Sequence, residues 1–384
     1  MLIKRPRLFE SIEMSVLQTP VTALLGPRQC GKTTISRMFS KGKEALYFDL
    51  EDPIDFLRLS DSPMITLEQA KGLIIIDEIQ RAPQLFSVLR VLSDRRDYTS
   101  RFLILGSASP QLIRQASESL AGRIAFIDMA GFTLEETGNN HLQTLWLRGG
   151  FPRSYLAVSE QSSFQWRQDF IRTFLERDIP QLGISIPAES LRRFWTMLSH
   201  YHGQVWNGSE FARSIGATEP TARRYLDILS GAFVVRQLQP WFENIKKRQI
   251  KSPKVYISDS GLLHALLQLE GNNILSHPKL GASWEGFIIG QLIGIMKVPC
   301  YFWGTYAGAE LDMFTVHKGK RIGVEIKYTD APGITKSIMV SLNDLLLDHL
   351  YIIYPGQKSY RLSEKVEVIP AKYIYDHFSD KKSQ

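Results

Sequence analysis

The feature that most constrains this chain is a glycine-containing segment near its N-terminus. Residues 24–34, with the sequence LLGPRQCGKTT, match the phosphate-binding pattern G-x-x-x-x-G-K-[ST] from Gly26 to Thr33. The apolar run 21–25 before it predicts a buried strand, and residues 32–39 after it predict a helix. Backbone N–H groups at such a helix N-terminus favour bound phosphate. An ordinary glycine-rich turn before a helix is the alternative interpretation.

The pattern gives each part of the segment an expected role. Lys32 should reach the β- and γ-phosphates of ATP, and the Thr33 hydroxyl should bind Mg²⁺. The backbone of the loop should surround the phosphates. The expected nucleotide-binding residues are Gly26, Pro27, Arg28, Gln29, Cys30, Gly31, Lys32, Thr33 and Thr34.

A second apolar strand ends in two carboxylates. Residues 72–76 have the sequence GLIII, and Asp77 and Glu78 follow directly, which is typical of a buried parallel strand with charge at its C-terminal end. Ligands of open α/β sheets bind at that edge. We therefore expect Asp77 to hold Mg²⁺, directly or through water, and Glu78 to activate the attacking water. A strand that simply ends in an acidic turn is the alternative.

Two further residues could complete a hydrolytic site. Ser107 ends an apolar run that begins at residue 101, and it could contact the γ-phosphate or the attacking water. It could equally cap the helix that follows Pro110. Arg123 precedes the predicted strand 124–129. It is either a surface charge or, if the protein forms a ring, an arginine finger for a neighbour's γ-phosphate.

Composition limits what the rest of the chain can be. A length of 384 residues predicts two or three domains. No apolar run approaches the ~20 residues of a membrane span, and residues 1–7 lack the apolar core of a signal peptide. Cys30 and Cys300 are the two cysteines, so we expect no disulfide framework and a cytoplasmic location. A net charge of +7 permits nucleic-acid binding without requiring it.

The middle of the chain is helical and then changes pattern. Residues 154–200 carry aromatic side chains at a spacing that favours packing over base stacking. Residues 207–238 predict a helix, a glycine-containing turn, a second helix and a β-wing. Arg223 and Arg224 on the second helix could approach DNA, but a lid or regulatory module fits equally well. The basic run 246–251 is either a solvated linker or a nucleic-acid patch.

Acidic and basic side chains converge again in the C-terminal third. The predicted strands 310–316 and 321–328 are joined by a turn that contains Lys318-Gly319. Folding the hairpin about that pair places Asp312 opposite Glu325, and the alternation of side chains places Lys327 on the same face. Two opposed carboxylates repel unless a cation lies near them. A surface strand that happens to contain E-x-K is the alternative.

This arrangement resembles the PD-(D/E)XK nucleases. The resemblance implies that Asp312 and Glu325 bind Mg²⁺ and that Lys327 stabilises the attacking water or the phosphate. Glu285, near the start of a predicted helix, resembles the additional helix carboxylate of that fold. A domain of this kind can also persist as a binding scaffold without cleavage.

The motif order of the whole chain resembles the AAA+-type bacterial and archaeal ATPases that carry a C-terminal domain of unknown function. The segments that carry the resemblance are GPRQCGKT, YFDLEDP, LIIIDEIQ, LILGSAS, SLAGR, LRGGFP and FLERD. It implies an α/β fold with a five-stranded parallel AAA+ core, a helical lid, a winged helix and a nuclease-like α/β domain. We place these parts at residues 1–153, 154–200, 201–245 and 246–384. The resemblance also implies that Arg123 is an arginine finger or a sensor residue.

The expected function is ATP hydrolysis with Mg²⁺ that drives a winged-helix and nuclease-like module on nucleic acid. DNA is the candidate partner, and a homo-oligomer is expected if Arg123 is a finger. The main alternative is a nucleotide-dependent signalling or assembly switch that recruits protein partners. Residues 150–152 favour it, because they resemble the Gly-x-Pro motif of signalling ATPases. An ordinary Gly-Pro turn is the alternative interpretation of these residues. A P-loop kinase is disfavoured by the adjacent Asp77 and Glu78 and by the long C-terminal extension.

Overall fold

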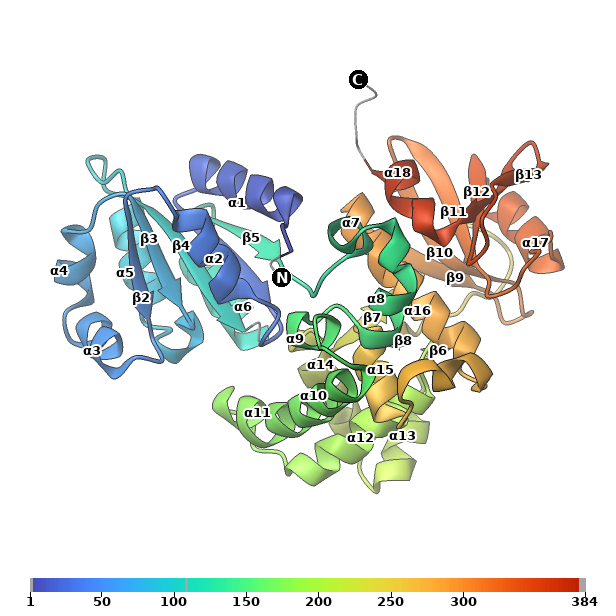
Figure 1. The fold of residues 1–384 in the computed structure, drawn as a ribbon, viewed down its shortest axis with the longest axis horizontal. Coiled ribbons are helices and arrows are strands. Elements are labelled where there is room, and N and C mark those ends of the chain that lie inside the picture. The colour runs from blue at the N-terminus through green and yellow to red at the C-terminus, as the bar shows by residue number, and fades with distance from the viewer. Residues whose placement is uncertain (1–2, 108–109, 380–384) are drawn as a thin grey trace. The chain divides into compact units, whose positions relative to one another are not determined.

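The computed structural model describes residues 3–107 and 110–379, and it describes residues 110–114 by their backbone alone. The chain divides into two compact units, which we describe separately (Figure 1). Unit 1 comprises Met1–Gly131 with Gly231–Phe233, and unit 2 comprises Phe132–Ser230 with Val234–Gln384. Among the described residues, no helix is both long and apolar enough to cross a bilayer.

Unit 1 is built on a parallel five-stranded sheet in the order β2-β3-β4-β1-β5. This confirms the expected parallel core. The central strands are buried along almost their whole length, which explains their continuous apolar sequences. The strands are β1 Val21–Gly26, β2 Ala45–Asp49, β3 Leu73–Asp77, β4 Arg101–Ser107 and β5 Ile124–Asp128.

Helices cover both faces of this sheet (Figure 1). Four of them, α3 to α6, share one hydrophobic core with alternate strand residues such as Val21 and Ala23. Helix α1 lies on the other face, where the Ser15 hydroxyl is 2.9 Å from that of Thr22. The helices are α1 Pro6–Gln18, α2 Lys32–Ser40, α3 Pro53–Asp61, α4 Pro63–Glu68, α5 Leu85–Ser93 and α6 Pro110–Ser119.

Unit 2 begins with helices and a small antiparallel sheet of order β6-β8-β7. From α12 onward its elements follow the order helix, strand, helix, helix, strand, strand. The strands are β6 Gln204–Val205, β7 Val235–Leu238 and β8 Lys254–Ile257. The helices are α7 Leu134–Thr137, α8 Leu142–Arg148, α9 Pro152–Tyr155, α10 Glu160–Thr173, α11 Ile179–Gln181, α12 Ala188–His200, α13 Gly208–Ile215 and α14 Glu219–Gly231, with a π-helical turn at Phe174–Asp178.

The rest of unit 2 is a mixed six-stranded sheet of order β13-β14-β12-β11-β10-β9 with four helices. Strands β10 and β11 form the predicted hairpin, and Lys318 and Gly319 both adopt positive φ at its turn. The strands are β9 Cys300–Gly304, β10 Glu310–His317, β11 Lys320–Ile326, β12 His349–Tyr354, β13 Tyr360–Ser363 and β14 Val366–Pro370. The helices are α15 Ser260–Leu266, α16 Leu280–Met296, α17 Lys336–Asp344 and α18 Ile374–Phe378.

Two expected boundaries differ from this arrangement. Residues 132–153 group with unit 2, because α8 packs on α15 and α10. The expected boundary after residue 245 falls between β7 and β8, which pair with each other along four residues. The small sheet therefore extends past the expected end of the winged helix.

The basic run 246–251 is not a free linker. It lies in the connection between β7 and β8, which bridges to the larger sheet between Gln249 and Thr305. Lys247 forms an ion pair of 2.6 Å with Asp344, and the guanidinium of Arg248 lies 4.5 Å from the ring centre of Tyr306. These contacts hold the run against the larger sheet.

Candidate functional site

The P-loop adopts a conformation that requires glycine. Gly31 has φ of +99° and starts α2 in the left-handed region. A side chain on Gly26 would place its Cβ 2.1 Å from the Met129 carbonyl oxygen. The buried Cys30 thiol points to that same carbonyl, at 3.6 Å. Cys30 therefore packs beneath the loop, and its backbone is the part that could face a phosphate.

The Lys32 ammonium is buried below the loop. It donates hydrogen bonds to the carbonyl oxygens of Gly26 at 3.0 Å and Pro27 at 2.9 Å. These acceptors carry no net charge, whereas a buried cation is stabilised by an anion. The position of Lys32 thus fits a phosphate-binding role.

Asp77 at the end of β3 is held by three donors. Its Oδ2 accepts hydrogen bonds from the Thr33 hydroxyl at 2.7 Å and from the Tyr47 hydroxyl at 2.5 Å. Its Oδ1 accepts from the backbone N–H of Glu78 at 2.9 Å. The structure therefore brings Thr33 and Asp77, the two Mg²⁺ ligands predicted for the P-loop site, into direct contact.

Tyr47 is a site residue that the sequence analysis missed. It lies on β2, and burial raises the pKa of its hydroxyl, with a further contribution from Asp77. The group stays protonated and remains a hydrogen-bond donor. Its position in the sequence could have identified it, because Tyr47 lies two residues before the C-terminal end of β2, the strand that pairs with β3.

Glu78 directly follows β3 in a left-handed conformation, with φ of +57°. Its carboxylate accepts a hydrogen bond from the Gln80 amide and lies 4.0 Å from the Arg28 guanidinium. Burial raises the pKa of Glu78, and the nearby charges of Lys32 and Arg28 oppose that rise. A carboxylate with a raised pKa beside a phosphate loop is suited to accept a proton.

Ser107 lies at the same edge of the sheet, because it pairs with Gly26 at the end of β1. Within the described part of the chain, its buried hydroxyl oxygen has no hydrogen-bond partner. Such a group is stabilised by a ligand or a water molecule. The alternative role as a cap of α6 involves residues 108–109, which lie outside the described residues.

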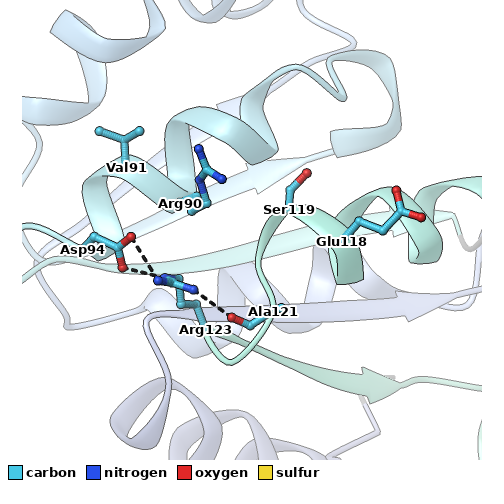
Figure 2. Close-up of a pocket in the computed structure, with 7 residues that line it drawn as sticks. All are labelled: Arg90, Val91, Asp94, Glu118, Ser119, Ala121 and Arg123. Atoms are coloured by element: carbon cyan, nitrogen blue, oxygen red, sulfur yellow. Dashed lines mark hydrogen bonds and ion pairs between the residues drawn. The ribbon is translucent and has the colours of Figure 1, made fainter.

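Arg123 lies at the opposite edge. The next residue, Ile124, pairs with Val21 at the start of β1, so the length of that strand, about 17 Å, separates Arg123 from Gly26. Arg123 forms an ion pair with Asp94, with Nε–Oδ1 of 2.5 Å, and donates to the Ala121 carbonyl (Figure 2). A sensor contact with the nucleotide of its own chain is incompatible with this position.

Arg123 is one of the residues that line a cavity of about 400 Å³. Figure 2 shows these lining residues. The cavity is formed by the C-terminal parts of α5 and α6 and the segment before β5. Its lining residues are Arg90, Val91, Asp94, Glu118, Ser119, Ala121 and Arg123. A finger role for Arg123 would have to act on another copy of the chain.

The C-terminal candidates also come together. Asp312 and Glu325 are both buried on adjacent strands, and the backbone N–H of Ile326 donates to Asp312 Oδ2 at 2.7 Å. Lys327 Nζ lies 2.6 Å from Glu325 Oε1. Burial strongly raises the pKa of Asp312, and repulsion from Glu325 and Glu285 adds to the rise. The hairpin register is the predicted one.

Lys254 is the main residue of this site that sequence reasoning missed. Its side chain is 3% exposed, and its ammonium contacts Glu285 at 3.1 Å, the Glu310 carboxylate, and Asp312 at 3.9 Å. The hydroxyl of Tyr256, two residues further along β8, donates a hydrogen bond of 2.6 Å to the same Glu285 oxygen. We call Lys254, Tyr256, Glu285, Glu310, Asp312, Glu325 and Lys327 the carboxylate–lysine cluster.

The fit of this cluster to a divalent metal is partial. One oxygen of Glu325, Oε2, is buried without a hydrogen-bond partner in the described residues, and four carboxylates face two lysines. That charge favours a cation. However, no three His, Cys, Asp or Glu side chains in the described part of the chain are arranged to hold one metal ion.

The parallel sheet and the P-loop site of unit 1 are those of an AAA-type P-loop domain. Residues 18–138 match the family described as an AAA domain. The solved Walker-type ATPase PABY2304 of Pyrococcus abyssi has a similar fold, with a TM-score of 0.51 and 13% identity over 69% of this chain and 96% of that chain. This likeness concerns the fold alone.

The chain belongs to the same family as two uncharacterized mycobacterial proteins, Rv2008c of Mycobacterium tuberculosis (strain ATCC 25618 / H37Rv) and Mb2031c of Mycobacterium bovis (strain ATCC BAA-935 / AF2122/97). Each is 50% identical to it over 376 residues, which cover 97% of this chain and 85% of the relative. Residues 139–273 and 280–374 match two domains of unknown function, DUF8612 and DUF4143. These two matches lie almost entirely in unit 2.

Proposed function

We propose that this protein hydrolyses ATP with Mg²⁺. The observation that carries the proposal is the 2.7 Å hydrogen bond between Thr33 and Asp77, which joins the P-loop to the end of β3. The buried ammonium of Lys32 and the unpartnered hydroxyl of Ser107 support it, because both would be stabilised by a bound phosphate.

Each residue then has a defined task. The loop N–H groups and Lys32 bind the phosphates, and Thr33 and Asp77 hold the Mg²⁺, which neutralises phosphate charge. Glu78 accepts a proton from water as the water oxygen bonds to the γ-phosphorus and the bond to ADP breaks, giving ADP and inorganic phosphate. Ser107 orients the γ-phosphate or the water.

Substitution of Glu78 tests this assignment. Glu78→Gln should retain ATP binding and lose at least 100-fold in turnover, because the amide cannot accept the proton. The exposed substitution Glu364→Gln is the matched control and should leave both unchanged. Wild-type turnover in Glu78→Gln would remove Glu78 from this role.

We further propose that unit 2 acts on nucleic acid. The order α12, β6, α13, α14, β7, β8 with its three-stranded sheet supports a winged helix. Arg223 and Arg224 are exposed on α14, although Arg223 also pairs with Asp227 at 3.1 Å. The mixed sheet that carries Asp312, Glu325 and Lys327 supports a nuclease-like domain, with Glu285 contributed by α16.

Two measurements test that part of the proposal. Single- and double-stranded DNA should stimulate ATP turnover, and cleavage of DNA with Mg²⁺ or Mn²⁺ should disappear in Lys327→Ala. Stimulation without cleavage under any metal condition would make the nuclease-like domain a binding scaffold.

A signalling or assembly switch remains the second candidate. The turn before α9 favours it. The Asp259 carboxylate at the start of α15 accepts a hydrogen bond of 2.7 Å from the Gly150 N–H, and this bond links two helical segments of unit 2. A switch of this kind would bind protein partners and would not respond to DNA. We also propose a cytoplasmic location, which the free thiols of Cys30 and Cys300 support.

A further inference from the structure

We infer that Lys254 is the resident cation of the carboxylate–lysine cluster, and that a divalent metal ion binds there only in exchange for its ammonium group. The inference rests on the proposed nuclease-like role of this cluster. It adds a condition for metal binding at this site: the Lys254 ammonium must first move away from the carboxylates.

The first argument is the burial of Lys254. An ammonium removed from water is unfavourable unless anions surround it. Here Glu285, Glu310 and Asp312 all lie around the one ammonium. The opposed carboxylates of the hairpin require a nearby cation, and this side chain supplies one.

The second argument is geometric. Mg²⁺ and similar ions need several oxygen ligands at about 2.0–2.6 Å. Glu285 Oε1 is 3.1 Å from Lys254 Nζ and also accepts the hydroxyl of Tyr256 at 2.6 Å. Asp312 Oδ2 accepts a hydrogen bond from the Ile326 N–H at 2.7 Å, and Asp312 Oδ1 lies 3.9 Å from Lys254 Nζ. The ammonium therefore lies among the carboxylate oxygens that a metal ion would have to bind.

The third argument is the excess negative charge of the carboxylate–lysine cluster. The four carboxylates exceed the two ammonium groups, and the buried Oε2 of Glu325 has no hydrogen-bond partner among the described residues. Replacement of one ammonium by a divalent ion would bring the cluster closer to neutrality. Removal of Lys254 without replacement would leave uncompensated buried charge, which is strongly destabilising.

The exchange couples two parts of unit 2. Lys254 belongs to β8, which pairs with β6 and β7, whereas its carboxylate partners belong to α16 and β10. Metal binding and the position of this side chain on β8 are then linked, and each must influence the other to the same extent. The small sheet would thus control the access of metal to the cluster.

The test measures Mn²⁺ binding by the nucleotide-free full chain with calorimetry. Lys254→Met should bind Mn²⁺ at least tenfold more tightly than the wild type. The exposed Lys251→Met, three residues earlier, should behave as the wild type. The gained binding should be lost when Asp312→Asn is added. Equal Mn²⁺ affinities in Lys254→Met and the wild type would overturn the inference.

A second measurement needs no variant and decides the matter if Lys254→Met does not fold. Amine-reactive labelling of the wild type, read by mass spectrometry, should leave Lys254 protected without metal and modify it severalfold more at saturating Mn²⁺. Unchanged protection would contradict the exchange. Metal exchange without DNA cleavage would retain the inference while rejecting nuclease activity, so the two failures are distinguishable.

Discussion

The hydroxyl of Tyr47 donates a 2.5 Å hydrogen bond to Oδ2 of Asp77 across two paired strands. The same oxygen accepts from Thr33. Tyr47 therefore orients the carboxylate that we expect to hold Mg²⁺, without lying in the P-loop itself.

Tyr47→Phe should raise the Mg²⁺ concentration needed for half-maximal ATP turnover. Loss of a hydrogen bond to a charged group is worth about 1.5 kcal/mol, which corresponds to roughly tenfold. Nucleotide binding without Mg²⁺ should stay unchanged, because Asp77 would not contact the phosphates. Tyr98→Phe is the matched control, since that hydroxyl donates to the Leu67 carbonyl instead. An equal effect in both variants would argue for a merely structural role.

Gly26→Ala should destabilise unit 1. The added Cβ would lie 2.1 Å from the Met129 carbonyl oxygen, so either β5 or the loop must shift. We expect a loss of about 2–4 kcal/mol in the free energy of unfolding. Gly294→Ala in α16, where a Cβ meets nothing within 4 Å, should be neutral or slightly stabilising. Thermal and urea unfolding of the two variants compare them directly.

Two buried histidines predict a loss of stability in mild acid. Burial lowers the pKa of His202 and of His264 from 6.5 to about 3. The imidazole of His264 is held neutral between the Leu147 carbonyl and the Ser283 hydroxyl. Below pH 6.5 the two histidines become protonated in the unfolded chain but stay neutral in the folded chain. The free energy of unfolding therefore falls as the pH falls from 6.5 towards 3.

At pH 5 each of these histidines should lower the unfolding free energy by about 2 kcal/mol relative to neutral pH. Urea unfolding between pH 7 and pH 5 measures this slope. The double variant His202→Gln and His264→Gln is expected to be less stable at pH 7 but to show a flatter pH dependence. A slope that is the same in the double variant and the wild type would assign the acid sensitivity to other groups.

Substitution of Arg123 tests whether the protein hydrolyses ATP as a ring-shaped oligomer. If its guanidinium serves a neighbouring copy, Arg123→Ala should lower turnover at least 100-fold at protein concentrations that support assembly, with ATP affinity unchanged. Arg90→Ala, on the same cavity, is the control. Equal turnover in Arg123→Ala and the wild type, in a sample shown to be oligomeric by light scattering, would make Arg123 a surface charge paired with Asp94.

The sequence predicted the parts of the site that depend on local patterns. The P-loop and the strand that ends at Asp77 are local, and parallel pairing brings their ends to one edge. The register of Asp312 against Glu325 followed from a two-residue turn. The position of Arg123 could also have been inferred, because a residue before a parallel strand lies at the edge opposite the strand's C-terminal end.

Other features depend on packing between distant segments and left no local pattern. Lys254 is the single charged residue of a short buried strand, and its partners lie 31 to 58 residues further along the chain. The boundary between the units follows from the packing of α8 on α15 rather than from composition. Neither the contact of Lys254 with Glu285 nor this boundary could be read from spacing alone.

The division into two units has an optical consequence. All seven tryptophans of the chain belong to unit 2, whereas the P-loop and Asp77 belong to unit 1. Trp284 directly precedes Glu285, and its ring lies 5.2 Å from that of Trp146. Intrinsic tryptophan emission therefore originates entirely outside the unit that carries the P-loop. A change in that emission when ATP is added would report communication from unit 1 to unit 2 without any attached dye.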